Sequence, residues 1–327
     1  MTRYTSVLTA LMLSASPVLA QVPTVATDIA PIQSLVAQVM GDLGAPTLLM
    51  DKGSSPHGYA MRPSDAKNLQ NADVVFWTGN ALAPWLGGAI ETLGPEAVSV
   101  PLSENEASLQ LTFREGMTFE DDDHDDHDDH DDHDDHDDHD DHDDHDEHGA
   151  DEHHHDHHGI DPHAWLDPQN AIAWLDVIAK TLSDLDAENA PTYAANAADR
   201  AAQLTALTGR LQEQLADEHD IKFVVFHDAY QYFEERFGLS AMGAISLGDA
   251  ATPSPARISE LQHMIKEQGI DCVFSEPQFN PGLVTTLLEG TTAHRGVIDP
   301  LGQSIENGPD FYAKLIQGVA DSFDACR

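Results

Sequence analysis

The sequence predicts an α/β protein of two lobes, each built on a mostly parallel sheet of about four strands flanked by helices, and joined by a long rigid helix. Short apolar runs alternate with helical patterns in the first part of the 327-residue chain, and the same alternation returns after residue 220. The stretch between these two parts shows only helical periodicity. Strands that alternate with helices favour parallel sheets, and a chain of this length suggests about two domains.

The N-terminal lobe is expected over residues 21–170. Its predicted strands are Val22–Thr27, Thr47–Met50, Val74–Thr78 and Ala97–Pro101. Between the first two, apolar residues from Ile32 to Leu43 recur at helical spacing, and Gly44 closes the pattern.

Inter-lobe helices are expected over residues 171–219. Residues 168–186 are typical of one helix, and Pro191, suited to a first helical position, opens a second. About 28 residues at 1.5 Å per residue give a rod of about 42 Å, which indicates a rigid spine rather than a flexible linker. The alternative is two shorter helices broken near Gly209.

The C-terminal lobe is expected over residues 220–327. Its predicted strands are Phe223–His227, Ala241–Ser246, Cys272–Glu276 and Gly296–Asp299. An intervening helix is indicated by Ile258, Leu261 and Ile265 and ends at Gly269.

Residues 1–20 are typical of a signal peptide. Arg3 precedes the apolar stretch Val7–Leu13, which is too short to span a bilayer, and the small-residue site Val18-Leu19-Ala20 follows. We therefore expect the mature protein to begin near Gln21, outside the cytoplasm. In such an oxidising compartment Cys272 and Cys326 are expected to form a disulfide, with two free thiols as the alternative.

The net charge of −43 excludes a nucleic-acid partner, and it argues against docking on an anionic membrane through a basic patch. Residues 120–158 hold 23 of the acidic residues and no Lys or Arg, and the other 288 residues carry 35 acidic and 15 basic side chains. One segment therefore supplies more than half of the charge.

That segment repeats Asp-Asp-His eight times between Asp122 and His145 and then becomes richer in histidine. Without apolar residues it is predicted to be a disordered loop inserted in the first lobe. Imidazole and carboxylate both bind zinc, so we expect an auxiliary metal scavenger of modest affinity; the alternative is a solvating acidic segment. Its histidines are His124, His127, His130, His133, His136, His139, His142, His145, His148, His153, His154, His155, His157 and His158.

The specific metal site is expected elsewhere, because a flexible repeat offers no fixed geometry. His57 follows the second predicted strand, while His227 and Asp299 end strands of the second lobe, where ligands of open parallel sheets bind. His163 stands just before the inter-lobe helices. These three histidines and one carboxylate would form a four-coordinate zinc site. Glu276 is a candidate to orient a ligand ring, or else to cap the following segment.

Each of these residues also has a plainer interpretation, since a single histidine near a strand end is more often a satisfied polar residue than a ligand. Three functions were weighed: a zinc receptor, a zinc hydrolase with an activated water, and a metal buffer or chaperone. Against the hydrolase, the sequence has no His-Glu-x-x-His motif.

Five blocks, in order, resemble the cluster A-I metal-binding proteins of bacterial ABC importers, and most closely their zinc-uptake, ZnuA-type branch. The blocks are His57-Gly-Tyr-Ala-Met-Arg62-Pro63-Ser64-Asp65, Asp161-Pro-His163-Ala-Trp165-Leu-Asp167-Pro168, Phe226-His227-Asp228-Ala-Tyr230, Ser275-Glu276-Pro277-Gln278-Phe279 and Ile298-Asp299-Pro300-Leu301-Gly302. The histidine-rich insertion and the C-terminal cysteine pair also resemble that branch.

The resemblance implies a monomeric, non-enzymatic periplasmic receptor that captures Zn²⁺ between its lobes and delivers it to an ABC permease driven by a cytoplasmic ATPase. His57, His163 and His227 match the family's metal-binding histidines, and His227 stands where manganese-binding relatives have a glutamate. Asp299 matches the carboxylate that completes coordination in many relatives. Some zinc binders have a glutamate before the first histidine, where this chain has Pro56. The fourth ligand is therefore either Asp299 or water.

Overall fold

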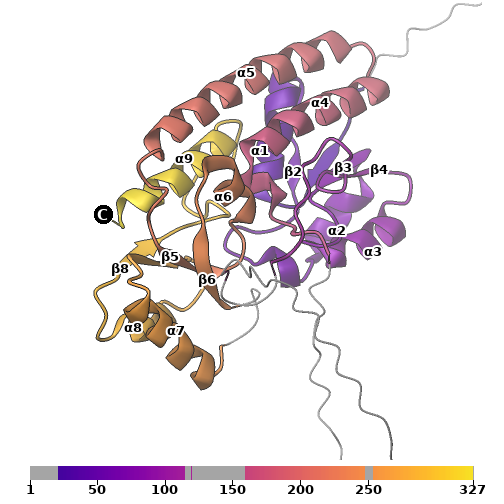
Figure 1. The fold of residues 1–327 in the computed structure, drawn as a ribbon. Coiled ribbons are helices and arrows are strands. Elements are labelled where there is room, and N and C mark those ends of the chain that lie inside the picture. Colours follow the sequence, from indigo (N-terminus) through magenta and orange to yellow (C-terminus); the bar gives the residue numbers. More distant parts are fainter. Residues whose placement is uncertain (1–20, 115–118, 120–158, 247–252, 327) are drawn as a thin grey trace, which may run out of the picture.

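The computed structural model describes residues 21–114, 119, 159–246 and 253–326 (Figure 1). In this part of the chain the strands form two four-stranded parallel sheets, with the orders β2-β1-β3-β4 and β6-β5-β7-β8. The predicted fold class is therefore confirmed. The signal segment and the repeat of residues 120–158 lie outside the described residues.

The first sheet carries helices in its crossover connections, as parallel pairing requires. Its strands are β1 (Val25–Thr27), β2 (Thr47–Leu48), β3 (Val74–Trp77) and β4 (Val98–Pro101). The helices are α1 (Ala30–Met40), α2 (Pro63–Gln70) and α3 (Pro84–Leu93), with the 3-10 turns η1 (Gly41–Leu43) and η2 (Pro56–Gly58). Strand β1 begins three residues after the predicted start at Val22, and β2 ends two residues before Met50.

The second sheet repeats the arrangement. Its strands are β5 (Phe223–His227), β6 (Ala241–Ser246), β7 (Cys272–Ser275) and β8 (His294–Val297). The helices are α6 (Gln231–Phe237), α7 (Pro255–Glu267), α8 (Gly282–Leu288) and α9 (Phe311–Asp324). Strand β8 lies two residues earlier than predicted, because its pairing with β7 runs from Cys272–His294 to Ser275–Val297.

Two helices connect the sheets and lie along one side of the molecule (Figure 1). After the 3-10 turn η3 (Ala164–Leu166), α4 spans Pro168–Leu185 and packs along α5, which spans Ala190–Gln214. The 25 residues of α5 continue through Gly209, so the alternative of two short helices is wrong. At 1.5 Å per residue α5 is about 38 Å long.

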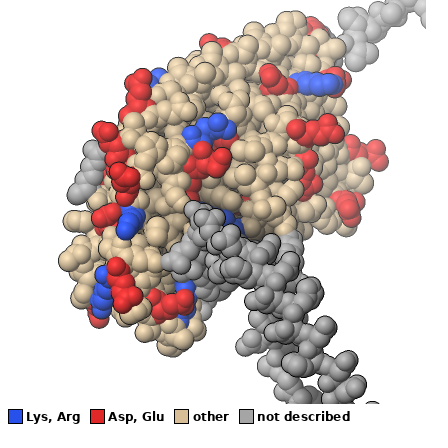
Figure 2. All heavy atoms as spheres, in the orientation of Figure 1, with Lys and Arg blue, Asp and Glu red and all other residues tan. Residues whose placement is uncertain are grey.

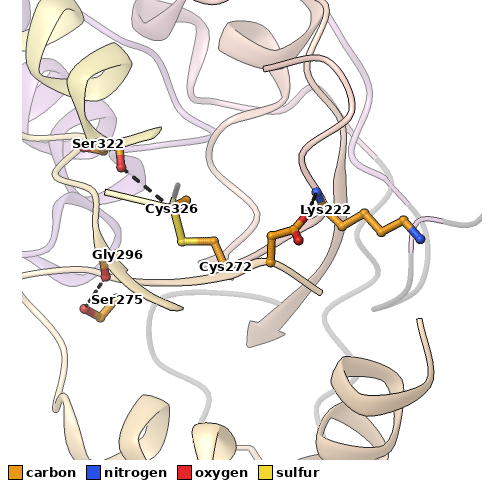
Figure 3. Close-up of a disulfide and its surroundings, with 7 residues drawn as sticks. Lys222, Cys272, Ser275, Gly296, Ser322 and Cys326 are labelled. Carbon is orange, nitrogen blue, oxygen red and sulfur yellow. Dashed lines mark hydrogen bonds between the residues drawn. A yellow bond between two sulfur atoms is a disulfide. The ribbon is translucent and has the colours of Figure 1, made fainter. Parts of the chain in front are cut away.

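A C-terminal helix also joins the two lobes. Helix α9 follows the second sheet but packs against α1 and α5, and Ser34 Oγ of α1 donates a 2.8 Å hydrogen bond to the carbonyl of Gly308. At the other end of α9 a disulfide joins Cys326 to Cys272 of β7 (Figure 3). The expected disulfide is confirmed, and it ties α9 to the second sheet.

One hydrophobic cluster runs from the first sheet through the inter-lobe helices to the second, and includes Trp174, Tyr193, Phe223 and Phe323. The face shown in Figure 2 carries acidic side chains over both lobes, interspersed with a few basic ones. Among the described residues, no helix is long and apolar enough to cross a membrane.

Candidate metal centre

His57 is presented by the short turn that follows β2. Pro56 opens η2, and the Ser55 side chain caps this turn by accepting a 3.3 Å hydrogen bond from the backbone N–H of His57. The Pro56 carbonyl accepts a 2.8 Å bond from the indole of Trp85. The turn therefore attaches to α3, and it leaves the His57 side chain half-buried.

His163 is held by a carboxylate two residues earlier in the chain. Asp161 Oδ1 accepts from the backbone N–H of His163 at 2.9 Å and lies 2.7 Å from its ring Nδ1. The His163 side chain is buried, and within the described chain its Nε2 has no hydrogen-bond partner. This nitrogen is the atom left to bind a ligand.

His227 is the last residue of β5, and its Nδ1 lies 2.6 Å from Glu276 Oε1. Glu276 directly follows β7, the strand beside β5, and its side chain is buried. The carboxylate sets the orientation of the ring and favours the tautomer with a proton on Nδ1, because a carboxylate can only accept. The structure thus brings Glu276, a candidate to orient a ligand ring, to the ring of His227.

The three histidines meet between the lobes. One ligand nitrogen of each lies within 4.8 Å of the others, and the centroid of the His163 ring is 5.4 Å from that of His57 and 5.3 Å from that of His227. Imidazole nitrogen is a preferred ligand of zinc, so these nitrogens fit one cation of that kind.

Asp299 is not part of this group of three histidines. Its Oδ1 accepts from the backbone N–H groups of Leu301 at 3.1 Å and Gly302 at 2.8 Å, and its Oδ2 accepts from that of Gln303 at 2.7 Å. Because β8 ends at Val297, Asp299 lies in the turn after the strand and its carboxylate holds that turn. The Asp299 carboxylate therefore stabilises this turn, a role that its position after an apolar run did not indicate.

A small cavity adjoins the three histidines and measures about 10 Å³. It is lined by Pro56, His57, His163, Trp165, His227, Gln278, Pro300 and Leu301. This space is close to the size of one water molecule.

Helix α6 of the second lobe holds the segments that carry His163. The Tyr232 hydroxyl donates to the carbonyl of Asp161 and accepts from the N–H of Leu111, both at 2.9 Å, and burial raises its pKa to about 12. Arg236 makes two 2.7 Å hydrogen bonds to Asp167. These side chains fix His163 relative to the second lobe.

Arg114 adds a third connection to α6. It lies 2.7 Å from Glu234 Oε2 and also pairs with Asp228, the residue after His227. Asp161, Arg114 and Gln278 were all missed as contributors to the site. Only Asp161 has a local signal, since a carboxylate two residues before a histidine can reach its ring.

Residues 25–326 match the family described as ZnuA, the periplasmic component A of the zinc-uptake complex. The chain belongs to this family. It is 46% identical over 303 residues to the high-affinity zinc uptake system protein ZnuA of Brucella abortus, covering 92% of this chain and 91% of that protein. It is also 46% identical over 318 residues to ZnuA of Paracoccus denitrificans, covering 97% and 95%. ZnuA proteins are periplasmic substrate-binding proteins for transport rather than enzymes, and their metal is zinc at the level of the family.

Solved structures share this fold at lower sequence identity. A Mn-bound periplasmic metal-binding protein from Candidatus Liberibacter asiaticus superposes with a TM-score of 0.70 at 18% identity, covering 93% of this chain and 100% of that one. A Zn(II)-bound AdcAII variant from Streptococcus pneumoniae gives 0.68 at 22% identity, covering 92% and 98%. One of these proteins holds manganese and the other zinc, so the fold alone does not determine the metal.

Proposed function

We propose that this ZnuA-family chain is exported through residues 1–20 and captures Zn²⁺ between its lobes with His57, His163 and His227. It then delivers the ion, as a monomer, to an ABC permease driven by a cytoplasmic ATPase. The observation that carries the proposal is the convergence of three histidine nitrogens from both lobes. Carboxylates at the Nδ1 atoms of His163 and His227 support it, because such partners orient metal-binding rings.

Zinc is favoured over manganese by the chemistry of the donors. Imidazole suits zinc, whereas manganese prefers carboxylate, carbonyl and water oxygens. The carboxylate predicted as a fourth ligand, Asp299, already accepts three backbone hydrogen bonds. We therefore propose water as the fourth ligand rather than Asp299.

The site geometry also bears on hydrolysis, the enzymatic alternative. A hydrolase needs a general base beside the metal-bound water. The carboxylates of Asp161 and Glu276 are instead engaged by the ligand rings. We accordingly propose transport rather than catalysis.

The test of the site is replacement of each histidine by alanine. His57→Ala, His163→Ala and His227→Ala should each weaken zinc binding by more than the roughly 10–100-fold that loss of an orienting partner causes. Calorimetry with a competing chelator measures this affinity. His263→Ala is the matched control, since His263 lies on the surface of α7 beside Glu267. Unchanged tight binding in all three variants would refute the site.

The repeat of residues 120–158 is proposed as an auxiliary scavenger that raises the local zinc concentration. Its deletion should lower the number of zinc ions bound while one tight site remains, as calorimetry of the shortened protein would show. Loss of the tight site would instead mean that the segment has a structural role. Growth on scarce zinc after deletion of the whole protein separates import from buffering, because only an importer is needed for uptake.

A further inference from the structure

Gln278 has one end of its side chain fixed by a known contact. Its Nε2 donates a 2.6 Å hydrogen bond to Glu276 Oε2. A carboxylate can only accept, so the amide must turn its NH₂ group toward Glu276 and its oxygen away. The hydrogen bond to Glu276 therefore decides which end of the Gln278 amide is the nitrogen and which is the oxygen.

The amide oxygen of Gln278 is buried and, within the described chain, accepts no hydrogen bond. A buried acceptor without a partner is unfavourable, because it has lost its hydrogen bonds to water and gained none in return. Gln278 lines the same small cavity as the three histidines, and the other side chains that line it are apolar or belong to Trp165. The indole of Trp165 already donates to the carbonyl of Pro300, at 2.9 Å.

The cation of the proposed function needs one ligand beyond the three imidazoles, because zinc sites in proteins are commonly four-coordinate. The cavity of about 10 Å³ is close to the size of one water molecule. A metal-bound water is a strong hydrogen-bond donor, since the cation lowers its pKa. Its requirement for an acceptor matches the requirement of the Gln278 oxygen for a donor.

Resting on the proposed function, we propose that Gln278 positions the fourth ligand: its amide oxygen accepts a hydrogen bond from a water bound to the captured cation. Glu276 holds both parts of this arrangement, because one of its oxygens contacts the His227 ring and the other the Gln278 amide. The buried Glu276 carboxylate thus positions both the His227 ring and the Gln278 amide, whose oxygen would accept the hydrogen bond from the water.

The test uses Gln278→Met, which keeps the length of the side chain and removes its oxygen, and Gln278→Leu as a second variant in case one misfolds. Zinc affinity, measured against a competing chelator, should fall about 10-fold, as expected for loss of a hydrogen bond to a charged group. The second readout is azide binding to the Co²⁺-loaded protein, followed by visible absorption. Azide should replace the water in the unchanged protein and bind several-fold more tightly to the variants, because an anion no longer faces the amide oxygen.

Gln214→Met is the matched control, since Gln214 lies at the end of α5 and hydrogen-bonds to Asp321. Weaker zinc binding with unchanged azide affinity would mean that Gln278 only supports Glu276, and would overturn the proposal. Absence of any azide response in the unchanged Co²⁺ protein would overturn it as well, because no exchangeable water would be present. In both cases the loss of zinc binding in the histidine variants would leave the proposed function intact.

Discussion

The two buried histidines of the site are oriented in the same way by unrelated parts of the chain. Asp161 reaches His163 from two residues away, whereas Glu276 reaches His227 from the neighbouring strand. In both cases the carboxylate contacts Nδ1, and Nε2 is then the ring nitrogen proposed to bind the metal. Rings that are held before the ion arrives lose less freedom on binding it, and this favours tight capture.

Asp161→Asn tests this orientation at the scale of one residue. Asparagine retains an oxygen but not the charge, so zinc affinity should fall about 10–100-fold, as for other partners of metal-binding histidines. Competition with a chelator measures the change. Asp186→Asn is the control, because Asp186 is also buried and hydrogen-bonded but contacts Tyr193 and Asn189 instead. Equal losses in the two variants would contradict a specific role of Asp161.

At the scale of single elements, α6 gives the site its rigidity. This helix of 7 residues directs Tyr232, Glu234 and Arg236 toward segments of the first lobe. Its partners Arg114 and Asp167 flank the segment that carries His163. His163 and His227 are therefore held near one another by contacts between protein side chains and the backbone.

Arg114→Met tests the contribution of α6 to stability. Glu234 is buried, with its side chain 4% exposed, and would lose its cation. Breaking a buried ion pair from one side costs about 3–5 kcal/mol, which urea unfolding of the metal-free protein would measure. Lys180→Met is the control, since Lys180 pairs with Asp184 and both side chains are exposed, at 75% and 66%, so its loss should change the stability little. A double variant Arg114→Met/Glu234→Leu should recover part of the loss. Equal stability of Arg114→Met and the control variant would argue against this contribution of α6.

Much of the arrangement of elements was predictable because it depends on local patterns. Apolar runs identified β5 and β6 at their observed bounds, and Pro191 indicated the start of α5 to within one residue. His57 and His227 could be proposed as ligands because each follows or ends a strand of a parallel sheet, at the edge where ligands bind. The position of β8 was harder to predict, since its pairing with β7 decides where the strand ends.

The contacts that complete the site could not be predicted in this way. Arg114 and Glu234 are 120 residues apart in the chain, and no periodicity connects them. Gln278 is an ordinary polar residue in the sequence, and only the fold shows that it bonds to Glu276 and lines the cavity beside the histidines. Asp299 was predicted to be a ligand because it follows an apolar run. Its hydrogen bonds to the backbone of the residues after it could not be seen in that pattern.

At the scale of the whole molecule, the lobes are joined more than once. Helices α4 and α5 connect them along the chain, α9 packs against α1 and α5, and the disulfide ties α9 to β7. One hydrophobic cluster runs through these connections. Release of the ion is therefore expected to involve small shifts or local loop movement rather than wide opening of the lobes.

The backbone on either side of the Asp-Asp-His repeat is joined at its base. Phe113 N–H donates to the carbonyl of Gly159 at 3.1 Å, and Thr112 forms an antiparallel bridge with Ile160. The paired backbone of the first lobe therefore extends to Phe113 before the repeat and continues from Gly159 after it. This pairing does not depend on how many Asp-Asp-His units lie between its two sides, so variants with a longer or shorter repeat are expected to keep the same lobes.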